Sequence, residues 1–345
     1  MIKRLKIGIS MGDPASVGPE IVCKFLHEYL KNKDNDFYPI IFGDLSILSL
    51  VASDLGFNLP FIPVYTHEEI FQKYEDGILV FTDKKWNIYN DEIMPGKGSV
   101  KGAEIAYLAI KNVAEAVLKQ VIDAVVTGPV NKSTIAKIEP NFTGHTEFFA
   151  ACTNSHNYAM LFDTKDFKVA LVTNHVSLNE ISEHISYNKI YQTIKLIKTS
   201  MESDFNIPEP KIAVLALNPH GGEGKFAGKG EDSRIDLACK EAKTNGIICD
   251  GPFSADGFWG QYFNEGKNRK YNAIIAMYHD QGLIPVKMAA FHDSTNVTIG
   301  LPIVRTSVSH GTAYDIAGTG SADHKSLKRA VEVAIKIAKR RRKRA

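Results

Sequence analysis

Short apolar runs rich in β-branched residues alternate along this chain with longer segments of helical periodicity. The runs are LKIGIS (5–10), YPIIFG (38–43), ILVF (78–81), AVVT (124–127), KVALVT (168–173), KIAVLAL (211–217) and NAIIAM (272–277). Segments 102–120, 188–205 and 324–340 repeat apolar residues at helical spacing. The expected buried face of the first segment is Ile105, Leu108, Ala109, Val113 and Val117. Strands that alternate with helices, and that are apolar throughout, predict an α/β fold with parallel strands covered on both faces.

Composition places the chain among ordinary soluble proteins. It has 345 residues, of which 44% are apolar and 23% charged, enough for one large or two moderate lobes. The four cysteines are scattered without a C-x-x-C pair, which argues against a disulfide framework and favours a reducing compartment. The N-terminal stretch is typical of a first strand, not of a signal peptide, and no apolar run approaches bilayer length. We therefore expect a cytoplasmic protein without a membrane partner.

The C-terminal stretch KIAKRRRKRA (336–345) holds most of the excess positive charge. Such a tail could bind nucleic acid or acidic lipid. Because no basic face studded with aromatic residues accompanies it elsewhere, the favoured interpretation is a solvated end to a terminal helix. We therefore expect no nucleic-acid partner.

Three histidines follow directly after expected strands: His175 in TNH, His220 in NPH and His279 in YHD. In open parallel sheets, ligands bind in the crevice outside the carboxyl ends of the strands. Neutral imidazole is a common ligand of first-row divalent metals, and three protein ligands leave a position open for substrate. The alternative is that each histidine is an unrelated residue at the end of a strand. The pattern does not decide between the two, but it excludes the H-E-x-x-H arrangement of zinc proteases.

Sequences that resemble nucleotide-binding loops do not fulfil the corresponding patterns. GPVNKST (128–134) has Asn131 before the lysine, and AGKG (227–230) lacks the following Ser or Thr, so a P-loop is not expected. Gly222, Gly224 and Ala227 match G-x-G-x-x-A, but glycines continue where a helix should begin. A loop beside the site is the favoured interpretation of this stretch.

Other candidates concern anions. His145 and Thr146 stand near an expected helix N-terminus, which suits an anion, although helix capping is the competing role. Lys287, Asn296 and Arg305 could together hold a phosphate or a carboxylate. The segment 309–323, SHGTAYDIAGTGSAD, has the composition of a loop that could contact a nucleotide.

Taken together, GDPASVGPE, TGPVNK, GHTEF, NPHGGEG, AMYHDQG and HGTAYDIAGTG resemble the 4-hydroxythreonine-4-phosphate dehydrogenase family of pyridoxal phosphate biosynthesis. The motifs run from residue 11 to 320 in the family's order. The HGTAYDIAG stretch is also similar to the adenosine-binding loop of the isocitrate and isopropylmalate dehydrogenases. The resemblance implies their two-lobed α/β/α fold, distinct from a Rossmann fold, with the active site in the interlobe cleft at a dimer interface. We expect the first lobe to comprise 1–130 and 305–345, and the second 131–304.

The resemblance also implies chemistry. Members oxidise 4-phosphooxy-L-threonine at C3 with NAD, NADP being the alternative cofactor, and the β-keto acid loses CO2 to give 3-amino-2-oxopropyl phosphate. A homodimer would hold one divalent ion (Zn, Mg, Co or Mn) on His175, His220 and His279, one of them from the partner chain. Implied substrate ligands are His145, Thr146, Lys287, Asn296 and Arg305. Implied cofactor ligands are His310, Gly311, Ala313, Asp315, Ile316 and Ala317.

Some assignments stay open. The proton acceptor is Asp256, Asp280 or Lys287, and sequence does not separate them. Ser16 and Lys225 stand where the family commonly has small residues, and 257–272 holds an expected insertion. The alternative functions are a paralogous dehydrogenase of threonate or erythronate 4-phosphate and, more remotely, a nucleic-acid-binding protein with a basic tail.

Overall fold

The computed structural model describes residues 4–32, 34–74, 77–86, 93–221, 228, 230–266 and 270–344. The chain forms two compact units, unit 1 (residues 1–155 and 301–345) and unit 2 (156–300). Unit 1 is therefore discontinuous in sequence. It extends past residue 130, because α5 (Lys132–Ile135) packs against α4 (Val100–Leu118) within it.

Unit 1 is an α/β/α sandwich. Its strands run parallel in the order β3-β4-β2-β1-β5-β12. This order differs from the 3-2-1-4-5-6 order of a Rossmann sheet. The strands are β1 (Leu5–Ser10), β2 (Phe37–Phe42), β3 (Phe61–Val64), β4 (Ile78–Phe81), β5 (Ala124–Thr127) and β12 (Arg305–Val308).

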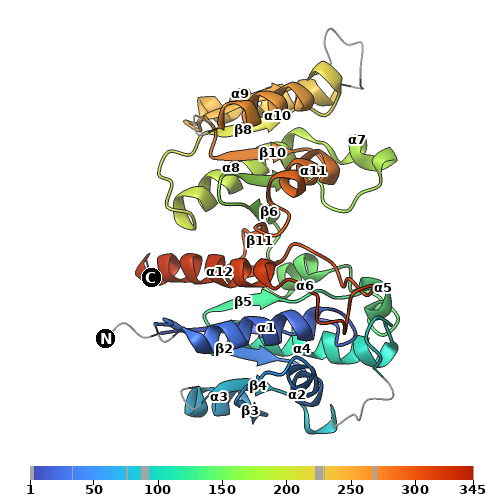
Figure 1. The fold of residues 1–345 in the computed structure, drawn as a ribbon. Helices are drawn as coiled ribbons and strands as arrows, with labels where there is room; N and C mark the ends of the chain where they lie inside the picture. Colours follow the sequence, from blue (N-terminus) through green and yellow to red (C-terminus); the bar gives the residue numbers. More distant parts are fainter. Residues whose placement is uncertain are drawn as a thin grey trace. The chain divides into compact units, whose positions relative to one another are not determined.

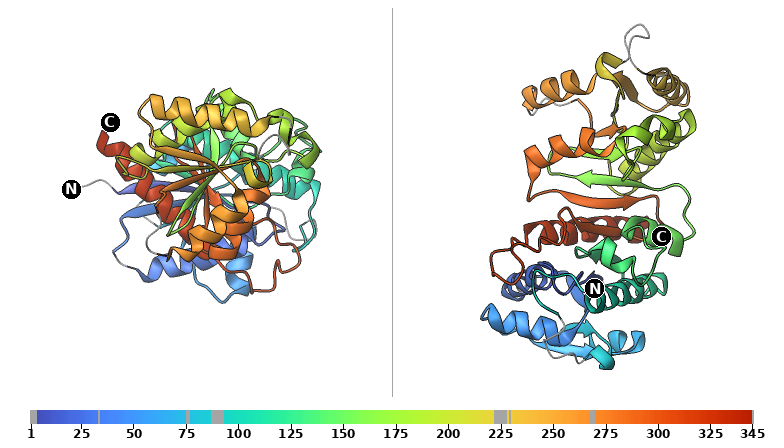
Figure 2. Two further views of the ribbon diagram at one scale, coloured as in Figure 1. Left: turned by 90° about the horizontal axis from the view of Figure 1, so that it is seen from above. Right: turned by 90° about the vertical axis from the view of Figure 1, so that its right-hand side faces the viewer.

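The helices of unit 1 cover both faces of its sheet. They are α1 (Gly18–Lys31), α2 (Leu45–Asp54), α3 (His67–Lys73), α4, α5, α6 (His145–Cys152) and α12 (Lys325–Arg344), with a 3₁₀ turn at Lys84–Trp86. Figure 2 shows α1 and α12 on one side of the sheet and α4 on the other. Of the face expected for α4, Ile105, Ala109, Val113 and Val117 are buried, but Leu108 is exposed. At about 100° per residue, Leu108 points away from the arc that the other four share.

Unit 2 is a second sandwich, with its strands in the order β11-β6-β7-β10-β8-β9. The pairs β6–β7 and β6–β11 are antiparallel, which the sequence interpretation missed. The strands are β6 (Ala159–Asp163), β7 (Lys168–Leu171), β8 (Ile212–Leu215), β9 (Cys249–Phe253), β10 (Ala273–Ala276) and β11 (Thr295–Ile299).

The helices of unit 2 lie on opposite faces of the sheet, with α8 and α9 on one side and α10 and α11 on the other (Figures 1 and 2). Aromatic residues of α10, including Trp259 and Tyr262, pack with Leu283 and Val286 of α11 against alternate residues of β7, β8 and β10. The helices are α7 (Ile181–His184), α8 (Tyr187–Ser203), α9 (Glu231–Thr244), α10 (Ala255–Asn264) and α11 (His279–Ala290), with a 3₁₀ turn at Leu178–Glu180.

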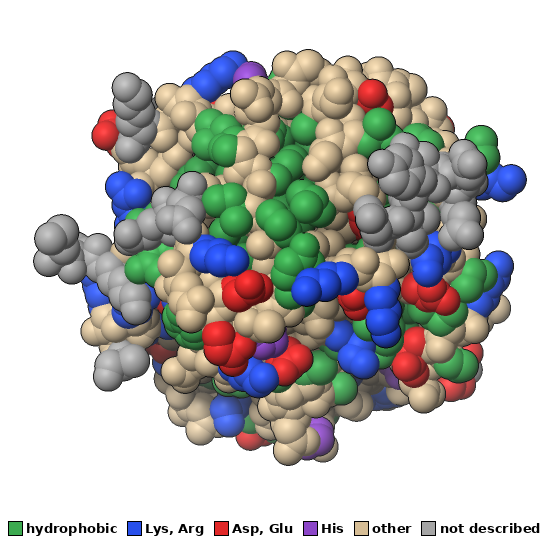
Figure 3. Space-filling model, turned by 90° about the horizontal axis from the view of Figure 1, so that it is seen from below, with side chains coloured by type: hydrophobic (Ala, Val, Ile, Leu, Met, Phe, Trp, Pro, Cys, Tyr) green, Lys and Arg blue, Asp and Glu red, His purple; other side chains and the backbone are tan. Residues whose placement is uncertain are grey.

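The basic C-terminal stretch continues α12 as far as Arg344. Arg341 donates hydrogen bonds to the carbonyls of Leu301 and Ile303, and Arg342 pairs with Asp123. Part of the excess charge therefore anchors the helix to unit 1. On the face of the molecule in Figure 3, Lys and Arg side chains lie among Asp and Glu. Within the described ranges, no helix is long and apolar enough to cross a bilayer.

Candidate active site

Two of the three strand-end histidines lie close together in unit 2. β7, β10 and β8 are neighbours that run parallel, so their carboxyl ends meet at one edge of the sheet. His175 follows β7 after a short loop, and His279 is the first residue of α11. Their ring centroids are 6.0 Å apart and their ring planes are inclined by 36°.

The imidazole of His279 is oriented by the carboxylate that follows it in the sequence. Its Nδ1 lies 2.8 Å from Asp280 Oδ1. If Nδ1 carries the proton and donates a hydrogen bond to Asp280, the lone pair of Nε2 is available to a cation. The negative charge of Asp280 in the first turn of α11 is also favoured by the helix dipole. Asp280 therefore fits the role of an orienting residue.

His220 lies on the wall of a cavity of about 510 Å³ in unit 2, which Asp256 and Asp280 also line. Ser254 Oγ donates to Asp256 Oδ1 over 2.5 Å. That bond, with a backbone bond from Gly257 and a smaller contribution from His220, lowers the pKa of the Asp256 carboxyl. Asp256 is thus ionised at neutral pH, and the cavity combines an imidazole with two carboxylates.

These donors suit a divalent cation, because imidazole and carboxylate are the side chains that first-row metals prefer. Within the described part of the chain, however, no three His, Cys, Asp or Glu side chains are gathered into one cluster. His175 and His279 are brought together, and His220 is placed with Asp256 and Asp280.

In unit 1, Arg305 is buried beside two threonines. It is the first residue of β12 and is 2% exposed. Its Nη2 donates to Thr127 Oγ1 over 2.6 Å, and its Nη1 lies 3.5 Å from Thr146 Oγ1. Burial lowers the pKa of Arg305 from 12.5 to about 9, although the nearby Glu147 opposes the shift. A buried guanidinium beside two hydroxyls is a setting that suits an incoming anion.

His145 is the first residue of α6, at the helix N-terminus that the sequence predicted. It lies close enough to the Arg305 guanidinium to be affected by its charge. Burial, followed by the positive charges of Arg305 and Lys132, holds the pKa of His145 well below 6.5. Its Nε2 is buried and has no hydrogen-bond partner among the described residues. His145 is therefore neutral at physiological pH and can offer one hydrogen bond to a bound group.

Lys287 and Asn296, the other two expected substrate ligands, lie in unit 2. Lys287 is half-buried on α11, with its Nζ 5.1 Å from the centre of the Phe291 ring, and desolvation lowers its pKa. Asn296 is buried on β11, and its Oδ1 has no hydrogen-bond partner in the described part of the chain. Both side chains have the chemistry of ligand-binding groups.

The expected cofactor loop is fixed to the segment that contains the GDPASVGPE motif. Tyr314 OH donates to Asp13 Oδ2 over 2.6 Å, and Val17 N donates to Thr312 O over 3.1 Å. Burial raises the pKa of Asp13, and the Tyr314 hydrogen bond partly offsets that rise. The carboxylate of Glu20 further accepts from the backbone N–H of Ala322 at 2.8 Å.

The expected cofactor residues from His310 to Ala317 belong to this anchored loop, which bends at Ala313, where φ is +44°. In the neighbouring motif, Ser16 donates to Asp13 O and accepts from Gly18 N, so its hydroxyl makes bonds that a glycine lacks. Lys225 and the glycine stretch 222–227 fall outside the described residues, as does part of the segment 257–272.

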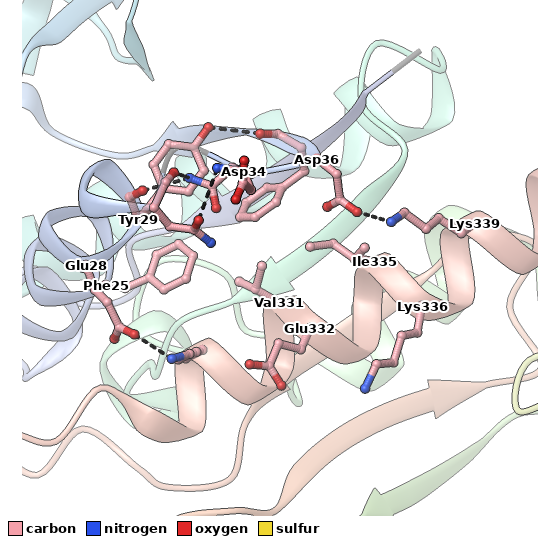
Figure 4. Close-up of a pocket in the computed structure, with 14 residues that line it drawn as sticks. Phe25, Glu28, Tyr29, Asp34, Asp36, Val331, Glu332, Ile335, Lys336 and Lys339 are labelled. Carbon is pink, nitrogen blue, oxygen red and sulfur yellow. Dashed lines mark hydrogen bonds and ion pairs between the residues drawn. The ribbon is translucent and has the colours of Figure 1, made fainter. Parts of the chain in front are cut away.

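A separate cavity of about 380 Å³ lies between α1 and α12. Its floor includes Phe25, Tyr29 and Val331, and Figure 4 shows Asp36 facing Lys339 at its rim. These two side chains form an ion pair. Among the described residues that line this cavity there is no histidine, so its lining differs from that of the sites described above.

Comparison with known proteins gives matches that extend over nearly the whole chain. Residues 35–334 match the family described as "Pyridoxal phosphate biosynthetic protein PdxA". A 4-hydroxythreonine-4-phosphate dehydrogenase of Prosthecochloris aestuarii is 37% identical over 95% of this chain and 96% of its own. A Symbiobacterium thermophilum protein, provisionally named a D-threonate 4-phosphate dehydrogenase, is 35% identical over 98% of each chain. The crystal structure of a 4-hydroxythreonine-4-phosphate dehydrogenase from Klebsiella pneumoniae has a TM-score of 0.79, with 28% identity over 97% of this chain and 99% of that one.

The fold and these matches define an oxidoreductase of the dehydrogenase class. The chain belongs to the pyridoxal phosphate biosynthetic protein PdxA family. The resemblance inferred from the motifs, and the two-lobed α/β/α architecture that it implied, are confirmed.

Several residues beside the candidate site had no assigned role at the sequence level. Asp13 and Thr127 lie within quoted motifs, but only the structure shows that they contact Tyr314 and Arg305. Gln281, within AMYHDQG, accepts a hydrogen bond from Met277 N just after β10. Asp232, at the start of α9, accepts one from Leu217 N just after β8. The only sequence signal for a role of Asp13, Thr127 and Gln281 was their position inside the quoted motifs, and Asp232 had no such signal.

Proposed function

We propose that this protein oxidises the C3 hydroxyl of 4-phosphooxy-L-threonine with NAD and a divalent cation. The alcohol gives up a hydride to NAD and a proton to the protein. The resulting β-keto acid releases CO2 to give 3-amino-2-oxopropyl phosphate. The observation that carries the proposal is the adjacent pair His175 and His279, next to strand ends that also bear His220 and two carboxylates.

His175, His220 and His279 would hold the cation, with one of the three supplied by a second subunit. A cation there lowers the pKa of a neighbouring hydroxyl and stabilises negative charge on its oxygen. Asp280 would keep Nε2 of His279 available by accepting a hydrogen bond from the Nδ1–H group.

A homodimer is supported by the surface of α11. Ile284, Met288 and Phe291 recur at helical spacing and are 56%, 83% and 60% exposed. The helix that carries this apolar stripe begins at His279. Exposed apolar surface of this kind is typical of protein–protein contacts. A second copy on α11 would therefore lie beside the metal ligands.

The remaining residues have roles that follow from their environments. Arg305, Thr146 and His145 would bind an anionic group of the substrate, and Asn296 Oδ1 would accept a hydrogen bond from an N–H or O–H group of the substrate. Lys287 is the preferred proton acceptor, because desolvation lowers its pKa towards the working range of a base. Asp256, with its lowered pKa, is a weaker base, and Asp280 is occupied with His279. The loop from His310 to Ala317 would bind NAD, or NADP.

The relatives named for D-threonate 4-phosphate support a second candidate substrate with a hydroxyl in place of the amino group. The deciding experiment measures NADH formation from 4-phosphooxy-threonine beside threonate 4-phosphate, before and after chelation. We expect metal-dependent turnover of the amino acid in preference to the sugar acid. Turnover of neither substrate with metal supplied would refute the proposal, and a preference for threonate 4-phosphate would establish the second candidate.

A further inference from the structure

The side chain of Gln281 joins the ends of two strands that lead to the expected metal ligands. Its Oε1 accepts from Met277 N over 2.7 Å, just beyond β10. Its Nε2 donates to Ala216 O over 2.7 Å, just beyond β8. β10 and β8 are paired neighbours, with Ile275 opposite Val214. The amide therefore bridges the two backbones immediately after their ladder ends.

The other neighbour of β10 is held at the same point. Thr173, two residues after the end of β7, donates to Met277 O from both its backbone N, over 3.1 Å, and its Oγ1, over 2.7 Å. Met277 is fully buried. Its backbone N–H and carbonyl are thus tied to Gln281 and Thr173, so three strand ends are linked through one residue.

Short segments lead from these ties to the imidazoles. His279 lies two residues after Met277, and His175 two residues after Thr173. His220 lies four residues after Ala216, and Asp232 clamps the intervening backbone by accepting from Leu217 N over 2.7 Å and from Asn218 N over 3.3 Å.

Gln281 is itself held in place from two sides. The indole Nε1 of Trp259, on α10, donates to Gln281 O over 3.1 Å. The adjacent Gly282 allows α11 to approach β7, since a Cβ there would lie 2.9 Å from side-chain atoms of Leu171 and Val169. Because it is held in this way, the Gln281 side chain can keep the backbone segments that follow β8 and β10 at a fixed distance from each other.

We propose that Gln281 is a positioning residue for the metal centre, because its amide fixes the backbone that leads to His279 and ties it to the strand ends that lead to the other expected ligands. This inference rests on the proposed function and extends it to a residue that touches neither cation nor substrate. Residues that orient metal ligands typically contribute ten- to a hundredfold to metal affinity.

The test compares Gln281→Met with wild type after chelator treatment, by Co²⁺ titration followed calorimetrically and by the visible absorption of the bound ion. Methionine keeps the length of the side chain but removes both hydrogen bonds. We expect Co²⁺ to bind about ten- to a hundredfold more weakly, with an altered visible spectrum. Measurement at a temperature where both proteins are fully folded prevents lost stability from weakening the apparent affinity.

Gln261→Met is the matched control, since Gln261 also lies on a helix of unit 2, where its side-chain amide donates to Glu265 Oε1 at the surface. It should bind Co²⁺ as wild type does. Thr173→Val is a second variant that removes one tie to Met277 O with little change of shape, and it should also weaken binding. It provides the test if Gln281→Met does not fold.

The outcomes separate the two proposals. Wild-type affinity and spectrum in folded Gln281→Met, or in Thr173→Val if that variant is the one available, would overturn the positioning role while leaving the metal centre intact. Absence of Co²⁺ binding by wild type itself would overturn the metal centre, and with it the inference.

Discussion

Replacing Arg305 with methionine should separate the stability of unit 1 from its capacity to bind an anion. The pKa of Arg305 falls from 12.5 to about 9 on burial. At 1.36 kcal/mol for each pKa unit, keeping this guanidinium charged in the ligand-free protein costs about 5 kcal/mol. Its removal also loses the hydrogen bond to Thr127 Oγ1 and leaves neighbouring hydroxyls buried, which together cost roughly 3–5 kcal/mol.

The balance predicts that ligand-free Arg305→Met is as stable as wild type or up to about 2 kcal/mol more stable. In a unit of this size, that gain corresponds to a rise of up to about 8 °C in Tm. Inorganic phosphate should raise the Tm of wild type, because it binds the folded state, and should have no effect on the variant. Differential scanning calorimetry with and without phosphate measures both effects.

Arg341→Met is the matched control, because Arg341 is also an arginine of unit 1 but donates to the carbonyls of Leu301 and Ile303. It should lower the Tm and leave the phosphate response unchanged. If ligand-free Arg305→Met melts well below wild type, the guanidinium stabilises the folded state on balance, and the reasoning is wrong. An undiminished phosphate response in that variant would show that the anion binds elsewhere.

Three further predictions concern pH, proton transfer and the cofactor loop. Because burial holds the pKa of His145 well below 6.5, the unfolded state binds a proton that the folded state does not. The free energy of unfolding therefore loses nothing to this group above pH 6.5 and falls by up to about 1.4 kcal/mol per pH unit below it. Urea denaturation of His145→Gln should not show this fall. If Lys287 accepts the proton, Lys287→Met should lower kcat by about 10²- to 10⁴-fold with the cation still bound, and a loss under tenfold would exclude it. Tyr314→Phe removes the hydrogen bond to Asp13 and should raise KM for NAD severalfold with the Tm nearly unchanged; an unaltered KM would separate this contact from the cofactor.

Much of the fold was predictable because its signals are local. Apolar strands such as Ala124–Thr127 and Ala273–Ala276 were predicted from their composition, and α12 was predicted from its helical periodicity. The strands β6 and β11 were missed because their antiparallel pairing is a long-range contact between segments more than 130 residues apart. Leu108 was misassigned because hydrophobicity alone does not locate the edge of a buried face.

The sequence by itself determined the α/β class, the family and the candidate ligands, since each depends on residue type and order. Only the tertiary structure decided which of these residues meet. It placed His175 beside His279, buried Arg305 between Thr127 and Thr146, and fixed the loop after β12 to Asp13. It also gave the glutamine of AMYHDQG a role, because a hydrogen bond from its amide to Ala216 spans residues that only folding brings together.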